Sequence, residues 1–181
     1  MNILDIINKK RLNETLTYDE LAYAFNGYLN KEIPDYQMSA LLMAITINGL
    51  SFDETLNLTK IFIDSGEVFK YDRDICDKHS TGGIGDTVTF IIAPILAALD
   101  IPIAKMSGRG LGITGGTADK LEGIPGYNIY LSREDYINNI NNCNISIGSQ
   151  TDTLVPLDKV IYALRDVTGT TESIPLIASS I

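Results

Sequence analysis

The sequence predicts an α/β protein, in which a run of helices is followed by an α/β region with parallel strands. In the first third, apolar residues recur at helical spacing between helix start and stop signals. Further along, short apolar segments alternate with glycine-rich loops and a helix, which is typical of parallel strands. The 181 residues are 45% hydrophobic, enough to form a folded core.

Four helices are expected within residues 1–66. The second and the fourth begin at capping boxes, Thr17–Glu20 and Ser51–Glu54, in which a hydroxyl and a carboxylate each accept a backbone N–H. Pro34 suits the first turn of the third helix, and Gly49 ends it. These helices carry no evident chemistry, so we expect their apolar faces to pack on one another or on a partner subunit.

The pattern changes to that of an α/β domain from Lys78 to Gly148. An apolar helix of about Val88–Leu99 follows a first glycine-rich loop. Strands are predicted at Ile101–Met106 and Ile145–Gly148, and Ser132 can cap a helix between them. This order of loops, helices and strands favours a parallel sheet with crossover connections.

The composition argues against several classes of protein. A net charge of −9 leaves no broad basic face, so a general nucleic-acid binder is not expected. Cys76 and Cys143 lack metal-ligand spacing, and with His79 as the sole histidine we expect two reduced thiols rather than a zinc site.

No apolar run approaches the roughly 20 residues that span a bilayer. The longest, Phe90–Leu99, contains Pro94, and the N-terminus lacks the layout of a signal peptide. We therefore expect a cytoplasmic protein without a membrane partner.

Two glycine-rich loops, Thr81–Asp86 and Ser107–Thr117, are candidates for a phosphate site. Glycine lets backbone N–H groups converge, and a following helix adds further N–H groups and a positive dipole end. Hydroxyls and cations lie in or beside both loops: Lys78, Ser80, Thr81, Thr87, Thr89, Lys105, Ser107, Arg109, Thr114 and Thr117. The alternative is a pair of tight turns. Neither loop fits the P-loop or the dinucleotide pattern, so an ATPase or a nicotinamide enzyme is not favoured.

His79 lies between Lys78 and Ser80 at the mouth of the first loop. Histidine can carry a proton near neutral pH, and this one adjoins the expected anion site. We infer a catalytic or substrate-contacting role for His79, with a structural role as the alternative.

At this point the residues resemble the thymidine and pyrimidine-nucleoside phosphorylase family. The resemblance is carried by the signature Ser107–Glu122, by the phosphate loop Asp77–Asp86, and by the pyrimidine-binding segments Tyr162–Thr168 and Glu172–Ile181. It implies a glycosyltransferase (a pentosyltransferase) that splits pyrimidine (deoxy)nucleosides reversibly with inorganic phosphate. The products would be the free base and (2-deoxy)ribose 1-phosphate. No organic cofactor is implied.

The resemblance also implies roles for individual residues. Phosphate would be held by Lys78, Ser80, Thr89, Lys105, Ser107 and Thr117. The pyrimidine would be framed by Tyr162, Arg165 and Ser180, with His79 and Arg165 as catalytic residues. Gly85 and Thr87 resemble positions that contribute to a potassium site in some members. On the residues alone, Arg165 would instead form a surface ion pair with Asp166 or a nearby carboxylate.

The implied architecture is a two-lobe α/β protein. Residues 1–66 and 157–181 would form a small all-helical domain through which members form homodimers, and residues 72–156 would form the first part of a parallel-sheet α/β domain that is incomplete in this chain. The helices from Pro156 to Arg165 and from Pro175 would belong to the pyrimidine-binding segment. Closure of the two lobes would bring base and phosphate together. Members of the family are more than twice as long, so we expect this chain to be a fragment that does not catalyse phosphorolysis alone.

Two other readings stay open. Anthranilate phosphoribosyltransferase shares the two-lobe architecture, but its Gly-Thr-Gly-Gly-Asp loop is replaced here by His79–Gly83. A non-enzymatic helical dimerisation module with a residual anion site is the second. Sizing chromatography and phosphate titration would separate it from the enzyme.

Overall fold

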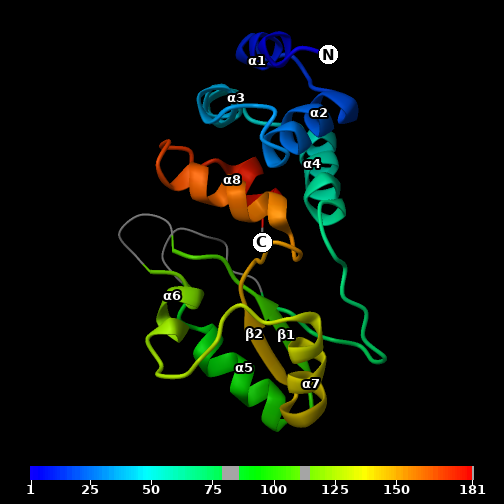
Figure 1. The fold of residues 1–181 in the computed structure, drawn as a ribbon, viewed down its shortest axis with the longest axis vertical. Coiled ribbons are helices and arrows are strands. Elements are labelled where there is room, and N and C mark those ends of the chain that lie inside the picture. Colours follow the sequence, from blue (N-terminus) through cyan, green and yellow to red (C-terminus); the bar gives the residue numbers. More distant parts are fainter. Residues whose placement is uncertain (79–85, 111–114, 181) are drawn as a thin grey trace. The chain divides into compact units, whose positions relative to one another are not determined.

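The computed structural model describes residues 1–78, 86–110 and 115–180 (Figure 1). It divides into two compact units, Met1–Glu67 with Asp152–Ile181 (unit 1) and Val68–Thr151 (unit 2). The chain thus leaves unit 1 once and returns to it. The return falls at residue 152, a few residues before the break that the sequence suggests at 157.

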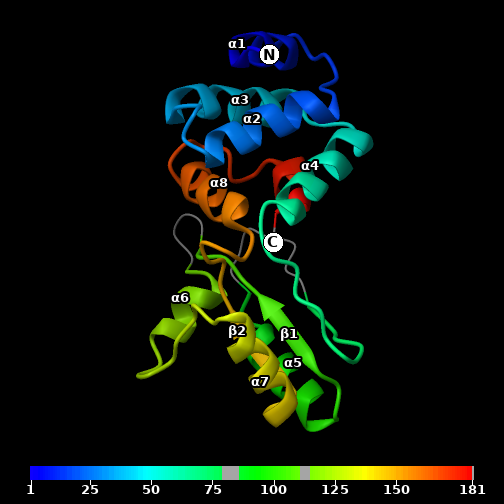
Figure 2. The ribbon, with the colours of Figure 1, turned by 45° about the vertical axis from the view of Figure 1, so that its right-hand side comes forward.

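The regular elements in the described part of unit 1 are all helices. They are α1 (Ile3–Arg11), α2 (Tyr18–Leu29), α3 (Asp35–Asn48), α4 (Phe52–Asp64), α8 (Pro156–Asp166) and α9 (Ile174–Ser179) (Figures 1 and 2). Both predicted capping boxes are confirmed: Thr17 accepts from Glu20 N, and Ser51 accepts from Glu54 N. Pro34 is the residue before α3 rather than part of its first turn, and Gly49 ends α3 with a φ of 72°.

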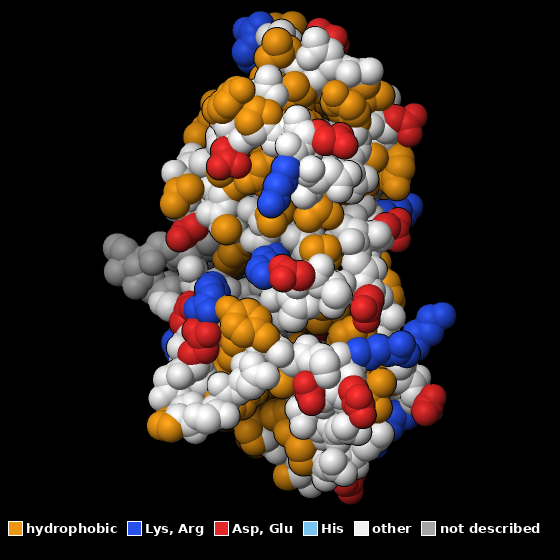
Figure 3. All heavy atoms as spheres, viewed as in Figure 1, with side chains coloured by type: hydrophobic (Ala, Val, Ile, Leu, Met, Phe, Trp, Pro, Cys, Tyr) orange, Lys and Arg blue, Asp and Glu red, His pale blue; other side chains and the backbone are white. Residues whose placement is uncertain are grey.

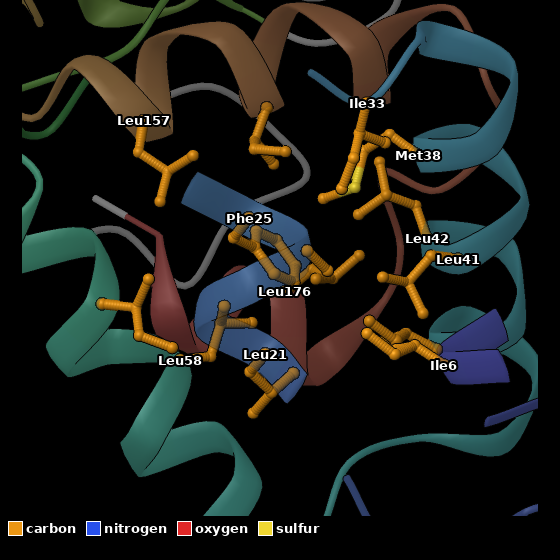
Figure 4. Packing of buried hydrophobic residues seen from close by; sticks show 14 of the residues in the cluster. Ile6, Leu21, Phe25, Ile33, Met38, Leu41, Leu42, Leu58, Leu157 and Leu176 are labelled. Carbon is orange, nitrogen blue, oxygen red and sulfur yellow. The ribbon is translucent and has the colours of Figure 1, made fainter. Parts of the chain in front are cut away.

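The core of unit 1 draws on both parts of the sequence. Phe25 of α2 packs edge-on against Phe62 of α4, with ring centroids 5.8 Å apart. Leu157 of α8 and Leu176 of α9 are buried in the same cluster. Figure 4 shows side chains of this cluster pointing toward one another from α2, α3, α4, α8 and α9: Phe25, Leu42, Leu58, Leu157 and Leu176. The four N-terminal helices therefore share one core with the two C-terminal ones.

Two consecutive lysines tie α1 to the capping boxes. Lys9 Nζ lies 2.8 Å from Glu20 Oε2, where the side chains are 28% and 19% exposed. Lys10 Nζ lies 3.0 Å from Glu54 Oε1, where both side chains are only 3% exposed. Both ion pairs thus join a lysine at the end of α1 to the glutamate of a capping box, and they differ mainly in how deeply they are buried.

Unit 2 contains a parallel sheet, as predicted. Its described elements are α5 (Thr89–Ala98), β1 (Ile103–Met106), α6 (Thr117–Glu122), α7 (Arg133–Cys143) and β2 (Ile145–Gly148). The strands pair in parallel with Ile103 opposite Ile145, and a further parallel bridge joins Cys76 to Ile103.

The two faces of this sheet meet different helices. Ile103 and Ile147 share a buried cluster with Ala93 of α5. On the other face, the Tyr136 hydroxyl of α7 lies so close to Gly148 that a Cβ there would come within 2.5 Å of it. Lys105 lies two residues after Ile103 in β1, so the two side chains are on the same face of the sheet, the one that α5 covers.

Two sequence predictions for unit 2 need correction. The first strand begins at Ile103 rather than Ile101, since Pro102 has no N–H to donate to a sheet. The sequence does not predict the short helix α6, because its six residues follow directly on a glycine-rich loop and are too few to show helical periodicity.

Candidate phosphate and pyrimidine sites

The predicted site residues are distributed over both units. Lys78, Thr89, Lys105, Ser107 and Thr117 lie in unit 2, and Tyr162, Arg165 and Ser180 lie in unit 1. His79, Ser80 and Gly85 lie outside the described residues, as does much of the first glycine loop.

Asp86, at the end of the first loop, gathers three predicted phosphate residues around its carboxylate. Lys78 Nζ forms an ion pair with Oδ1. Thr89 Oγ1 donates to Oδ2 at 2.6 Å, and Lys105 Nζ lies 3.6 Å from the same oxygen. The Asp86 side chain is 7% exposed and that of Lys105 is 3% exposed, so this is a largely buried charge cluster.

The secondary structure explains why these groups meet. Lys105 projects from β1 toward α5, and Thr89 is the first residue of α5. Val88, the residue that precedes α5, makes no side-chain capping bond. A helix N-terminus carries a partial positive charge, so with two ammonium groups beside it this region favours an anion.

The residues that flank the two glycine loops are in contact. Lys105 Nζ, just before the second loop, donates to Lys78 O at 2.5 Å. Thr117 Oγ1, just after that loop, donates to Asp86 O at 3.1 Å. The structure therefore brings together Lys78, Thr89, Lys105 and Thr117, which the sequence places up to 39 residues apart.

Ser107 and Thr87 are placed differently. Ser107 Oγ makes a long 3.3 Å hydrogen bond to Gly108 O, and its N–H donates to Gly148 O at 2.9 Å. Thr87 is exposed. Among the described residues, no three histidine, cysteine, aspartate or glutamate side chains form a metal-binding group. The potassium role of Gly85 and Thr87 stays a prediction.

Asp119 closes the second glycine loop across its base. Its Oδ2 accepts from Gly110 N at 2.6 Å and from Gly116 N at 2.8 Å. A Cβ on Gly116 would lie 2.5 Å from Gly110 N, so only glycine permits this approach. Arg109 pairs with Asp119 at 3.0 Å and with Glu122 at 2.7 Å, so two carboxylates engage the charge that the sequence offers for phosphate.

The carboxylates at both loops are held in the charged form. Burial alone would raise the pKa of Asp86. Hydrogen bonds from Lys78 and Thr89, with the charges of Lys78 and Lys105, outweigh burial and hold that pKa below its ordinary value. For Asp119, burial is likewise outweighed by the two backbone N–H bonds and by Arg109, so its pKa is lowered too.

Arg165 is buried in unit 1, with 1% of its surface exposed. Its guanidinium donates to Leu176 O at 3.0 Å and Thr171 O at 3.1 Å, and Nε makes a longer bond to Thr170 O. The reading of Arg165 as a surface ion pair is therefore wrong. Burial lowers its pKa, whereas the charge of Asp158 and the neighbouring Tyr162 act in the opposite direction.

The other pyrimidine-segment residues lie near this arginine. Tyr162 is on α8 and partly buried, and Ser180 follows α9. Ser180 Oγ donates to Asp158 Oδ1 at 2.6 Å, and Asp158 itself is buried. The structure thus groups Tyr162, Arg165 and Ser180 in one neighbourhood of unit 1, while a contact with a pyrimidine stays a prediction.

Sequence reasoning assigned no role to Asp86 or Asp119. Each stands beside a glycine-rich loop and close to the start of a helix, which was an available signal. Their partners, however, are set by tertiary contacts.

On the face drawn in Figure 3, lysine and arginine side chains lie scattered among acidic ones. Within the described parts of the chain, none of the helices has the length and apolar character needed to cross a bilayer.

Comparison with known proteins gives the family. The description "Glycosyl transferase family, helical bundle domain" matches residues 4–66, and "Glycosyl transferase family, a/b domain" matches residues 72–181. Proteins named pyrimidine-nucleoside phosphorylase are similar over the whole chain. The one from Staphylococcus epidermidis (strain ATCC 12228 / FDA PCI 1200) is 50% identical over 185 residues. Those from Bacillus subtilis (strain 168) and Geobacillus stearothermophilus are 50% and 48% identical over 184 residues. The chain spans 42% of the length of each of these relatives. It therefore belongs to the glycosyl transferase family that is defined by this helical bundle domain and this a/b domain.

Proposed function

We propose that this chain forms the phosphate-binding and pyrimidine-binding parts of a pyrimidine-nucleoside phosphorylase. The reaction would be the reversible attack of inorganic phosphate on a pyrimidine (deoxy)nucleoside, giving the free base and (2-deoxy)ribose 1-phosphate. The relatives that are about half identical over the whole chain carry this name.

The observation that carries the proposal is the cluster around Asp86. Lys78 and Lys105 supply two positive charges, and Thr89 and Thr117 supply hydroxyls, at the start of α5. A phosphate that binds there would meet charge-assisted hydrogen bonds from the lysines and the positive end of a helix dipole. Ser80, Ser107 and the backbone of the glycine loops would complete the site.

The chemistry requires positioning above all. Phosphate must approach the glycosidic carbon in line with the departing base, and negative charge builds on that base as the bond breaks. Holding the two reactants in this geometry and stabilising the developing charge supply most of the rate enhancement. We assign the proton transfer or hydrogen bond at the base to His79, which adjoins Lys78 in the sequence.

On the pyrimidine side, we propose that Tyr162, Arg165 and Ser180 frame the base. The carbonyls that Arg165 binds belong to residues 170–176, so the arginine also fixes the path between α8 and α9. This fixed segment would give the base a preorganised surface. We further propose a cytoplasmic homodimer that assembles through the helical unit.

Two experiments test the function. Phosphate titration of the 181-residue chain by calorimetry should show saturable binding, and chloride at equal ionic strength should not reproduce it. In a protein that continues this chain to the length of its relatives, thymidine or uridine should release free base only when phosphate is present. His79→Ala should then lower turnover by roughly 10²–10⁴. Base release at the same rate without phosphate would show hydrolysis and would contradict the proposal.

A further inference from the structure

Asp86 stands at the centre of the cationic cluster, although it is an anion in a site suited to anions. Its Oδ1 pairs with Lys78, and its Oδ2 accepts from Thr89 at 2.6 Å and lies 3.6 Å from Lys105 Nζ. Its backbone carbonyl accepts from Thr117 at 3.1 Å. One residue therefore contacts four of the predicted phosphate ligands.

The burial of the cluster makes this carboxylate necessary. The Lys105 side chain is 3% exposed, so water solvates its ammonium group poorly. Among the described residues, that ammonium group contacts Lys78 O and Asp86 Oδ2. Without the carboxylate, two ammonium groups would face each other near a helix N-terminus, and each would turn toward solvent or another partner.

The charge balance still leaves room for a substrate. Two lysines against one carboxylate give a net positive charge, to which the dipole of α5 adds. A dianionic phosphate can therefore bind beside the cluster without removing Asp86 from it. The Asp86 carboxylate is 7% exposed against 26% for the Lys78 side chain, so it lies deeper than the lysine that would meet the anion.

We propose, resting on the phosphate site proposed above, that Asp86 is a positioning residue that holds Lys78, Lys105 and Thr89 in the arrangement that receives phosphate. It acts through these side chains and makes no contact with phosphate itself. Its removal should release the lysines and weaken phosphate binding, even though it also removes a negative charge from the site.

The test compares wild type with Asp86→Asn, Asp86→Ala and Asp86→Glu. Asp135→Asn is the control, since Asp135 is a capping carboxylate of the same unit that contacts neither lysine. The first measurement is acetylation of each lysine by a limiting amine reagent, mapped by mass spectrometry, with exposed Lys70 of the same unit as internal reference. The second is the dissociation constant of inorganic phosphate by calorimetry, after circular dichroism has shown that each variant is folded.

Asp86→Asn and Asp86→Ala should raise labelling of Lys78 and Lys105 about fivefold relative to Lys70. They should also weaken phosphate binding by about tenfold or more. Asp86→Glu should restore part of both, and Asp135→Asn should match wild type. A merely structural role would not change the labelling of these two lysines selectively.

Unchanged labelling would overturn the proposal, whatever phosphate does. Raised labelling with phosphate binding as tight as in wild type, or tighter, would also overturn it, because the carboxylate would then only compete with phosphate. If wild type does not bind phosphate at millimolar concentration, the proposed function fails. In that case labelling alone decides whether Asp86 positions the lysines.

Discussion

Replacing Glu54 by glutamine should destabilise unit 1 far more than the same change at Glu20. Both glutamates close a capping box, and both accept from a lysine at the end of α1. Glu54 also accepts from Leu16 N at 2.8 Å. Because Lys10 and Glu54 are each 3% exposed, Glu54→Gln leaves a buried ammonium without its counter-charge.

The size of the effect follows from burial. Breaking a buried ion pair by removing one partner costs about 3–5 kcal/mol. We expect about 3 kcal/mol, the lower end of that range, because Lys10 Nζ also donates to Glu14 O at 3.4 Å. The pair of Lys9 and Glu20 is partly exposed, so Glu20→Gln should cost below about 1 kcal/mol.

Urea unfolding followed by circular dichroism measures both variants. With a slope of about 2 kcal/mol per molar urea, Glu54→Gln should lower the midpoint by about 1.5 M. Adding Lys10→Met to Glu54→Gln should recover part of the loss, since no charge is then stranded. Equal midpoints for Glu54→Gln and Glu20→Gln would refute the reasoning, because burial would then not set the strength of these pairs.

Three further predictions follow from the described contacts. Burial raises the pKa of Glu54, but hydrogen bonds from the backbone and from Lys10 outweigh burial and lower that pKa overall. The contribution of the Glu54 carboxylate to the free energy of unfolding is therefore complete above its unfolded pKa and is lost as pH falls. The Glu54→Gln variant should accordingly lose less stability than wild type between about pH 5 and pH 3. Asp119→Ala should speed amide hydrogen exchange at Gly110 and Gly116 by about tenfold, because both N–H groups lose their acceptor. Asp119→Asn keeps one acceptor oxygen and should speed the exchange less. Equal exchange in wild type and both variants would show that Asp119 does not hold these two N–H groups. Gly116→Ala should lower the free energy of unfolding, measured by heat or urea, by about 1–3 kcal/mol, because the new Cβ would lie 2.5 Å from Gly110 N. Gly115→Ala is the control and should be tolerated, because the atom nearest to its Cβ would be 3.6 Å away.

Local signals in the sequence predicted most of the fold. The capping boxes at Thr17, Ser51 and Ser132 mark three helix starts, and the strand Ile145–Gly148 has its predicted bounds. These signals work because each depends on atoms only a few residues apart. Helix α6 was missed because its start is capped by Asp119 within a glycine-rich context that masks helical periodicity.

The candidate sites were less accessible to sequence reasoning. The loops and their lysines could be selected, but the contact of Lys105 with Asp86 joins a strand to a loop and no local pattern encodes it. Without the family resemblance, the sequence wrongly predicts a surface ion pair for Arg165, for the same reason. Its acceptors are three carbonyls, two in the turn after α8 and one in α9, and only the folded chain brings them to the guanidinium.

The interrupted path of the chain has a consequence for its synthesis on the ribosome. The hydrophobic core of unit 1 includes Leu157, Ile161 and Leu176, which are translated only after the whole segment Val68–Thr151. A nascent chain must therefore carry α1–α4 with part of their apolar core uncovered while unit 2 emerges from the exit tunnel. During that interval the four helices are a natural client for a chaperone, and a stall before α9 would leave them prone to aggregation.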